Sequence, residues 1–157
     1  MTRYAGLGAD SDSRPSWCES EAYMSYVDGV KVVNAAKRRL GAPYLYGAER
    51  AKFDDPMKPI DCSELVEMAF KESGLPMVDG ARNQIHACRS CSLTLASNVP
   101  GALVFWRKNA LSPISHVGIS TGQGNVIHAS GGAGKVIVEK MSAFRWTCAG
   151  LPTTIYG

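Results

Sequence analysis

The segment PIDCSE, residues 59–64, decides the fold class, because it joins an apolar lead-in to the start of a helix. Asp61 is a residue type that caps helix N-termini, and Glu64 stands three residues later as the partner of a capping box. Cys62 therefore lies on the first helical turn, where unpaired amide N–H groups and the helix dipole favour a thiolate. We expect Cys62 to be a nucleophile with a lowered pKa, and a buried, inert cysteine is the alternative.

Two histidines lie in a hairpin pattern further along the chain. Residues 115–120 (SHVGIS) and 125–130 (NVIHAS) are short β-type runs on either side of the turn sequence TGQG, residues 121–124. In an antiparallel pair about this turn, His116 and His128 project from the same face, as opposite or diagonal neighbours roughly 5 to 8 Å apart at their backbones. A thiol, a base and a group that orients the base form the arrangement of a nucleophilic enzyme.

The order of the expected elements is that of an α+β protein. Helices are expected around residues 19–26, over 30–40, from 62 to about 73 and within 81–88. Strands are expected at 102–106, 116–120, 126–129, 136–139 and 153–156. The N-terminal helices, including the one with Cys62, should pack against the central antiparallel sheet that carries the histidines.

Length and composition indicate one globular domain. The chain has 157 residues, of which 20% are charged and 45% apolar. We expect an N-terminal arm over residues 1–27 and one domain over 28–157. The net charge of +3 is small, and the basic cluster Lys37-Arg38-Arg39 suits a helix C-terminus, so no nucleic-acid partner is expected. No apolar stretch has the length of a signal peptide or a membrane span.

The other cysteines are Cys18, Cys88, Cys91 and Cys148. In an oxidising compartment these four allow three pairings, each of which would leave Cys62 free. The CxxC at residues 88–91 has a histidine nearby but no second ligand pair at zinc-finger spacing. We therefore expect no metal and no cofactor.

Five segments resemble, in this order, the successive motifs of NlpC/P60 cysteine peptidases: GAPYLYGA at 41–48, DCS at 61–63, PGALVFW at 100–106, HVGI at 116–119 and IHAS at 127–130. The resemblance implies a papain-like α+β fold with a Cys-His-His triad. It also implies hydrolysis of amide bonds in peptidoglycan stem peptides, commonly between D-glutamate and the diamino acid.

The resemblance further implies roles for individual residues. Cys62 would be the nucleophile, His116 the base and His128 the residue that orients the base. Tyr44 would border the nucleophile and help to form the oxyanion site.

Substrate contacts are expected from four residues. The resemblance implies that Asp61 and Ser63 help to hold the stem peptide, and Trp106 is an aromatic residue that either lines the cleft or packs in the core. Glu64 stands where the family usually has glycine, so it adds bulk and negative charge beside the nucleophile unless it folds back onto the Asp61 amide. The long charged segment 49–59 is either a wall of the cleft or a surface insertion.

On this resemblance we expect a monomeric cysteine endopeptidase that cuts peptidoglycan stem peptides between D-glutamate and diaminopimelate. The alternatives are an acyltransferase or amidase with the same Cys-His chemistry, and a non-catalytic wall-binding module. Because no signal peptide is visible, we expect synthesis in the cytoplasm and arrival at the cell wall or periplasm by export, lysis, or delivery by a phage particle or secretion apparatus.

Overall fold

The computed structural model describes residues 20–47 and 55–157. The helices are α1 (Glu21–Lys37), α2 (Cys62–Glu72), α3 (Ala81–Gln84), α4 (Leu93–Ser97) and α5 (Thr153–Tyr156), with 3-10 turns at Ile85–Ala87 and Met141–Ala143. The strands are β1 (Cys88–Cys91), β2 (Leu103–Trp106), β3 (His116–Ser120), β4 (Asn125–Ser130), β5 (Lys135–Lys140) and β6 (Cys148–Pro152). Most of the expected arm, with Cys18, and residues 48–54 at the start of the expected charged loop lie outside the described residues.

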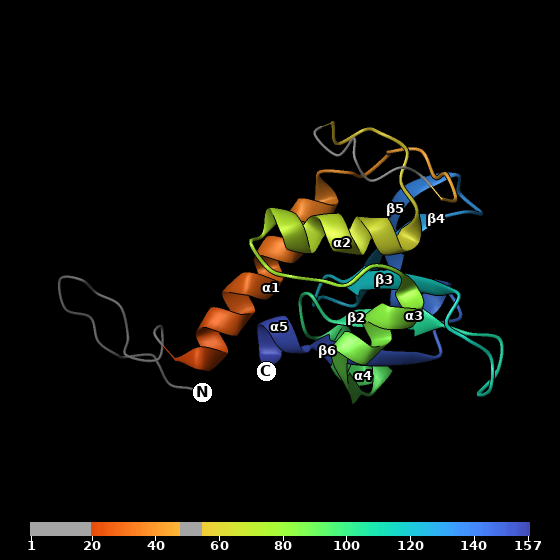
Figure 1. The fold of residues 1–157 in the computed structure, drawn as a ribbon. Coiled ribbons are helices and arrows are strands. Elements are labelled where there is room, and N and C mark those ends of the chain that lie inside the picture. Colours follow the sequence, from red (N-terminus) through yellow and green to blue (C-terminus); the bar gives the residue numbers. More distant parts are fainter. Residues whose placement is uncertain (1–19, 48–54) are drawn as a thin grey trace.

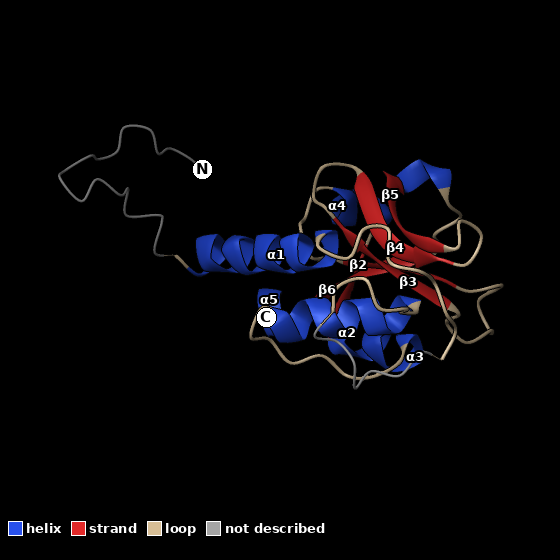
Figure 2. Cartoon of the chain, turned by 90° about the horizontal axis from the view of Figure 1, so that it is seen from above, coloured by secondary structure: helices blue, strands red, loops and turns tan. Residues whose placement is uncertain are grey.

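The described strands form one antiparallel sheet in the order β1-β6-β2-β3-β4-β5. Helix α2 covers one face of this sheet and α4 lies on the opposite face (Figures 1 and 2). The main core lies between α1, α2 and the sheet, where Leu65, Phe70, Ile119 and Ile127 have no more than 1% exposure. Burial of such side chains is the dominant stabilising term of a domain of this size. The expected α+β architecture is therefore confirmed.

The β3–β4 hairpin has the expected register. Ile119 pairs with Ile127 and Ser120 with Val126, so His116 and His128 are diagonal neighbours on one face. The other face contributes Ile119 and Ile127 to the main core. Because side chains alternate along a strand, the apolar core face fixes the histidines on the other face.

Helix α1 is one continuous helix, and the expected break between residues 26 and 30 is wrong. Gly29 lies inside it, buried where α1 crosses Pro100 and Tyr156. A Cβ atom on Gly29 would come within 2.2 Å of the Pro100 carbonyl oxygen, so this glycine serves a close approach rather than a turn. The expected boundary between arm and domain, at residues 27 and 28, falls within this helix.

The last residues form a helix, so the strand expected at 153–156 is wrong. Helix α5 packs against α1 near the C-terminus (Figure 1), where Ser25 Oγ donates a hydrogen bond of 2.7 Å to the Ile155 carbonyl oxygen. The Tyr156 hydroxyl donates to the Pro100 carbonyl oxygen. These contacts between distant segments stabilise a conformation that local propensity does not indicate.

A buried ion pair joins α1 to α2. Just beyond the C-terminus of α1, Arg39 is only 2% exposed, and its guanidinium donates to both carboxylate oxygens of Glu72, at 3.1 and 2.7 Å. The paired geometry satisfies the planar donors of arginine. None of the helices within the described ranges has the length and apolarity to cross a membrane.

Candidate active site

Cys62 is the first residue of α2, as the capping pattern predicts. Asp61 is the N-cap, and its Oδ1 accepts a hydrogen bond of 2.9 Å from the Glu64 amide. Asp61 Oδ2 accepts from the Gly47 amide at 3.3 Å, and Ser63 Oγ donates to Oδ1 at 3.3 Å. One carboxylate thus fixes both the helix start and the loop after Tyr44.

The two histidines and a glutamate form a continuous hydrogen-bonded chain. His116 Nε2 lies 2.7 Å from His128 Nδ1, and His128 Nε2 lies 2.7 Å from Glu139 Oε2. Glu139 comes from β5, where it pairs with Val126 while Ile137 pairs with His128, so it projects from the histidine face. His128 is 1% exposed and lies between the other two side chains.

The chemistry of this chain fixes the tautomers of both rings. The Glu139 carboxylate oxygen accepts, so His128 carries its proton on Nε2 and its Nδ1 accepts from His116 Nε2–H. Burial lowers the pKa of His116 to about 4, with the nearby His128 and Arg145 as smaller causes. Burial also lowers the pKa of His128, against the opposing effect of Glu139. His116 is therefore a neutral imidazole whose Nδ1 has a free lone pair.

The Cys62 thiol lies against the start of β3. The backbone amides of Val117, which directly follows His116, and of Ser63 and Cys62 act on the sulfur and favour a lower pKa of the thiol. Burial nevertheless raises the pKa of Cys62 to about 11, and the Asp61 charge adds to the increase. The expectation of a lowered pKa is wrong, because loss of solvent and a neighbouring carboxylate outweigh the helix-start amides.

Aromatic side chains pack against the rings of both histidines. The Trp146 ring stacks on the His116 ring with centroids 5.3 Å apart and an interplanar angle of 10°, and Phe144 lies 5.2 Å from His116. Gly118, between the two histidine positions on the same face, makes room for this packing. A Cβ atom there would lie 2.6 Å from Val126 Cγ1 and 2.9 Å from Trp146 Cη2.

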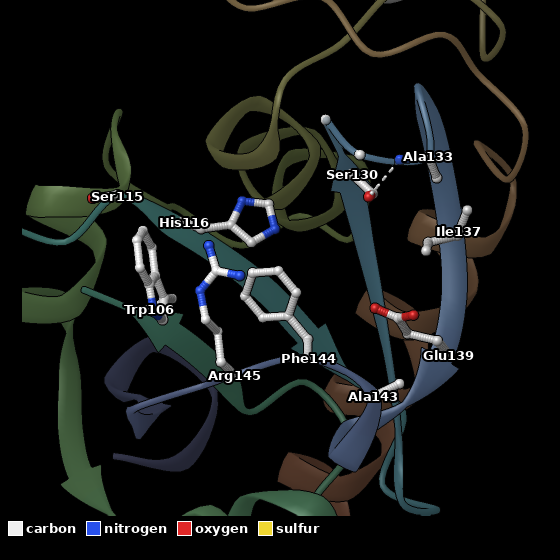
Figure 3. A pocket seen from close by; sticks show the side chains of 12 residues that line it. Trp106, Ser115, His116, Ser130, Ala133, Ile137, Glu139, Ala143, Phe144 and Arg145 are labelled. Carbon is white, nitrogen blue, oxygen red and sulfur yellow. Dashed lines mark hydrogen bonds between the residues drawn. The ribbon is translucent and has the colours of Figure 1, made fainter. Parts of the chain in front are cut away.

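Two pockets in the described part of the chain adjoin these residues. The cysteine pocket is lined by Tyr44, Tyr46, Asp61, Cys62, Ser63 and Arg82, among others. The histidine pocket is lined by Trp106, His116, Gly131, Glu139, Phe144 and Arg145, among others (Figure 3). Ser115 lines both, so the pockets meet beside the reactive groups.

Comparison with known protein families gives a match over most of the chain. The sequence profile described as the NlpC/P60 family matches residues 41–151. The chain belongs to the NlpC/P60 family.

Three relatives illustrate the likeness of this NlpC/P60 domain. It is 30% identical over 119 residues to a gamma-DL-glutamyl hydrolase of Bacillus subtilis, across 74% of this chain and 27% of that protein. It is 25% identical over 115 residues to the murein DD-endopeptidase MepH of Escherichia coli, across 73% and 41%. The solved structure of the peptidoglycan hydrolase RipB of Mycobacterium tuberculosis aligns with a TM-score of 0.64 and 27% identity, across 80% of this chain and 65% of that one. The chain spans less than half the length of these two curated relatives.

The structure brings most of the predicted site residues of this NlpC/P60 domain together. Tyr44, Asp61 and Ser63 line the cysteine pocket with Cys62, and burial and the proximity of Cys62 raise the pKa of the Tyr44 phenol. Trp106 lies in the histidine pocket instead.

Glu64, for which a substrate contact and a fold back onto the Asp61 amide are the two expectations, is a buried residue of α2. Glu64 is 7% exposed, and within the described part of the chain it lines neither the cysteine pocket nor the histidine pocket. The substrate contact expected of Glu64 stays a prediction.

Two residues that position the site are absent from the sequence prediction. Glu139 is an acidic residue in the otherwise apolar run VIVE of β5, and this anomaly, with the β4–β5 register, is the signal that identifies it. Gln84 is fully buried, and its Nε2 donates to the carbonyl oxygens of Ser63, at 3.0 Å, and Val78, at 3.1 Å. It ties the loop before α3 to the nucleophile helix.

Three further cysteines lie among the described residues and line neither of the two pockets. Cys88, Cys91 and Cys148 are free thiols in the structure. Among residues 20–47 and 55–157, no group of three His, Cys, Asp or Glu side chains is placed to hold a metal ion.

Proposed function

We propose that this NlpC/P60 domain is a cysteine peptidase that hydrolyses amide bonds in peptidoglycan stem peptides, at the bond between D-glutamate and diaminopimelate. The observation that carries the proposal is the hydrogen-bonded series His116–His128–Glu139, whose pocket meets the pocket of the half-buried Cys62 at Ser115. A base held by two further groups is the arrangement that nucleophilic amide hydrolysis requires.

In the acylation step, His116 Nδ1 accepts the thiol proton while the sulfur attacks the scissile carbonyl carbon. Because the thiol and the imidazole are both neutral at rest, proton transfer accompanies the attack rather than preceding it. The Cys62 amide and the Tyr44 hydroxyl are the donors proposed to stabilise the negative oxygen that forms.

The tetrahedral intermediate collapses when the carbon–nitrogen bond breaks and His116 returns the proton to the leaving amine. Water then gives a proton to His116 and attacks the thioester, and the sulfur leaves and regains a proton. His128 and Glu139 stabilise each imidazolium that forms on His116, since both accept along the same chain of hydrogen bonds.

The names of related proteins support this class of substrate. One relative is a gamma-DL-glutamyl hydrolase, another a murein DD-endopeptidase, and a structural relative is a peptidoglycan hydrolase. These names include two different bonds, so the choice of the D-glutamyl bond is part of the proposal. Its site of action would be the cell wall.

Digestion of defined muropeptides tests the proposal. We expect the protein to release products cut between D-glutamate and diaminopimelate, and Cys62→Ala to release none. Cys148→Ala is a matched control, because this free thiol lies on β6 and lines neither of the two described pockets. Loss of a cross-link with an intact D-glutamyl bond would contradict the specificity, and ligated products would indicate an acyltransferase.

A further inference from the structure

Arg145 is a cation held in place at the edge of the histidine pocket. Its guanidinium carbon lies 4.4 Å from the ring centroid of Trp106 and 5.2 Å from that of Phe144. Figure 3 shows the guanidinium between these two rings, on the side of His116. Among the residues that the structure describes, no carboxylate forms an ion pair with it.

Stacking prepares this guanidinium for a planar anion. A guanidinium on aromatic faces keeps its edge donors available, and these donors match the two oxygens of a carboxylate. Because the rings already restrict the side chain, binding an anion costs little further conformational entropy.

The position of His116 determines which half of the substrate this pocket receives. In the proposed mechanism His116 gives its proton to the leaving amine, so the leaving group must lie on the side of His116. Among the described residues the histidine pocket is lined by His116 and not by Cys62, whereas the cysteine pocket is lined by Cys62 and not by His116. The acyl half therefore belongs to the cysteine pocket and the leaving amino acid to the histidine pocket.

The histidine pocket carries both signs of charge. Arg145 provides a cation, and Glu139, whose side chain is 27% exposed, provides a carboxylate that lines the same pocket. Gly131 and Gly132 line it without side chains that would fill the space. Such a pocket is complementary to a free amino-acid end with one carboxylate and one ammonium group. The side chain of diaminopimelate has such an end, whereas the side chain of lysine ends in an ammonium group alone.

We propose that Arg145 is a specificity residue that binds the side-chain carboxylate of the leaving amino acid, so that a diaminopimelate stem is preferred over a lysine stem. This inference rests on the proposed function and deepens it.

Carboxylate binding at Arg145 would also act on the base. The positive charge of Arg145 is one of the causes, after burial and His128, that lower the pKa of His116. A bound carboxylate offsets that charge, so His116 becomes more basic when the preferred substrate is present. Recognition and proton transfer are thereby coupled.

The test compares two tripeptides, L-Ala-γ-D-Glu-diaminopimelate and L-Ala-γ-D-Glu-L-Lys, with the wild-type protein and Arg145→Gln. Both peptides carry an amide in place of the α-carboxylate of the third residue, so the side-chain carboxylate of diaminopimelate is the one carboxylate on a leaving amino acid. We expect the variant to lose roughly 10- to 100-fold in kcat/KM on the diaminopimelate peptide, mainly through KM, because a hydrogen-bonded charge contact is lost. On the lysine peptide kcat/KM should stay unchanged. The acid limb of kcat/KM should move to higher pH in the variant, since removal of the cation raises the pKa of His116.

Arg89→Gln is the matched control, because it makes the same charge change on β1, at the opposite edge of the sheet from β5. It should alter neither the substrate preference nor the pH profile. An equal loss on both peptides in Arg145→Gln would show a structural role and overturn the inference, and so would unchanged kinetics on both. If the wild-type protein cuts neither peptide, the proposed function fails and the inference fails with it; if it cuts both equally well, the inference alone fails.

Discussion

At the scale of single residues, Glu139 extends the expected three-residue site to four. It accepts from His128 at 2.7 Å, and this contact determines which nitrogen of each histidine carries a proton. Without it, the His128 ring would have no fixed tautomer, and Nδ1 of His116 would carry its lone pair for only part of the time.

The first prediction concerns these three residues. His116→Ala should lose about 10²- to 10⁴-fold in kcat, the usual contribution of a positioned base. Glu139→Ala should lose less, about 10- to 100-fold, because it removes one hydrogen bond to a charged partner. Glu139→Gln should retain more activity, since its amide oxygen still accepts from His128. Steady-state kinetics on one stem tripeptide measures all three, and full activity of His116→Ala would reverse the assigned roles.

The second prediction concerns pH. The proposed base, His116, can accept a proton only when neutral, and its pKa of about 4 means that kcat/KM should be constant through neutral pH and fall below about pH 4. The Cys62 pKa of about 11 means that its alkylation by iodoacetamide should keep rising up to strongly alkaline pH. A labelling plateau below pH 7 would instead show a resting thiolate–imidazolium pair.

Only part of the site was predictable from the sequence. Cys62, His116 and His128 follow from a capping pattern and from the parity of one hairpin, which are local features. Arg145 and Glu139 reach the site through the β4–β5 register and the segment before β6, so their roles depend on pairings that the local pattern does not determine. The Cys62 pKa was mispredicted because burial is a property of the folded chain.

At the scale of the elements, the β3–β4 hairpin places the histidines and Gly118 keeps them in contact with Trp146. Our third prediction is that Gly118→Ala destabilises the protein by about 1 to 3 kcal/mol, because its Cβ overlaps Val126 and Trp146. Gly118→Ala should also lower kcat, since the added Cβ would lie 3.1 Å from His128 Cβ.

Thermal unfolding of Gly118→Ala measures this cost. Gly132→Ala is the stability control, because its added Cβ would meet only Ser130 Oγ within the described residues, at 3.8 Å, which is an ordinary contact. Equal melting temperatures for the wild-type protein and Gly118→Ala would refute the packing argument.

The elements themselves were predicted unevenly. The nucleophile helix and the hairpin are correct because caps, turn residues and apolar spacing all agree there. Strands β1 (CRSC) and β6 (CAGLP) were missed because neither has strong strand propensity, and each forms by pairing with the other across a long sequence separation. Helix α4 was missed as well, since it is only a short turn after its Ser92 cap.

At the scale of the whole molecule, Arg39 and Glu72 hold the nucleophile helix to α1. The fourth prediction is that Glu72→Gln lowers the free energy of unfolding by about 2 to 3 kcal/mol, somewhat less than for a fully buried pair because Glu72 remains 22% exposed. The exposed Arg38, which also pairs with Glu72 at 3.1 Å, contributes little to this loss. Lys31→Gln removes only the exposed ion pair with Asp28, whose charged atoms are 3.9 Å apart. This substitution should change the free energy of unfolding by less than about 1 kcal/mol. Urea unfolding curves measure both, and equal midpoints for the two variants would contradict the role of this pair.

The central claim is that Cys62 forms a covalent bond to the acyl half of a peptidoglycan stem peptide. Intact-protein and peptide mass spectrometry after rapid acid quenching of a reaction with L-Ala-γ-D-Glu-diaminopimelate tests it most directly. We predict an adduct with the mass of the L-Ala-D-Glu acyl group on the peptide that contains Cys62, and none in Cys62→Ala. Cleavage of the tripeptide by Cys62→Ala, or an adduct on a different residue, would contradict the account.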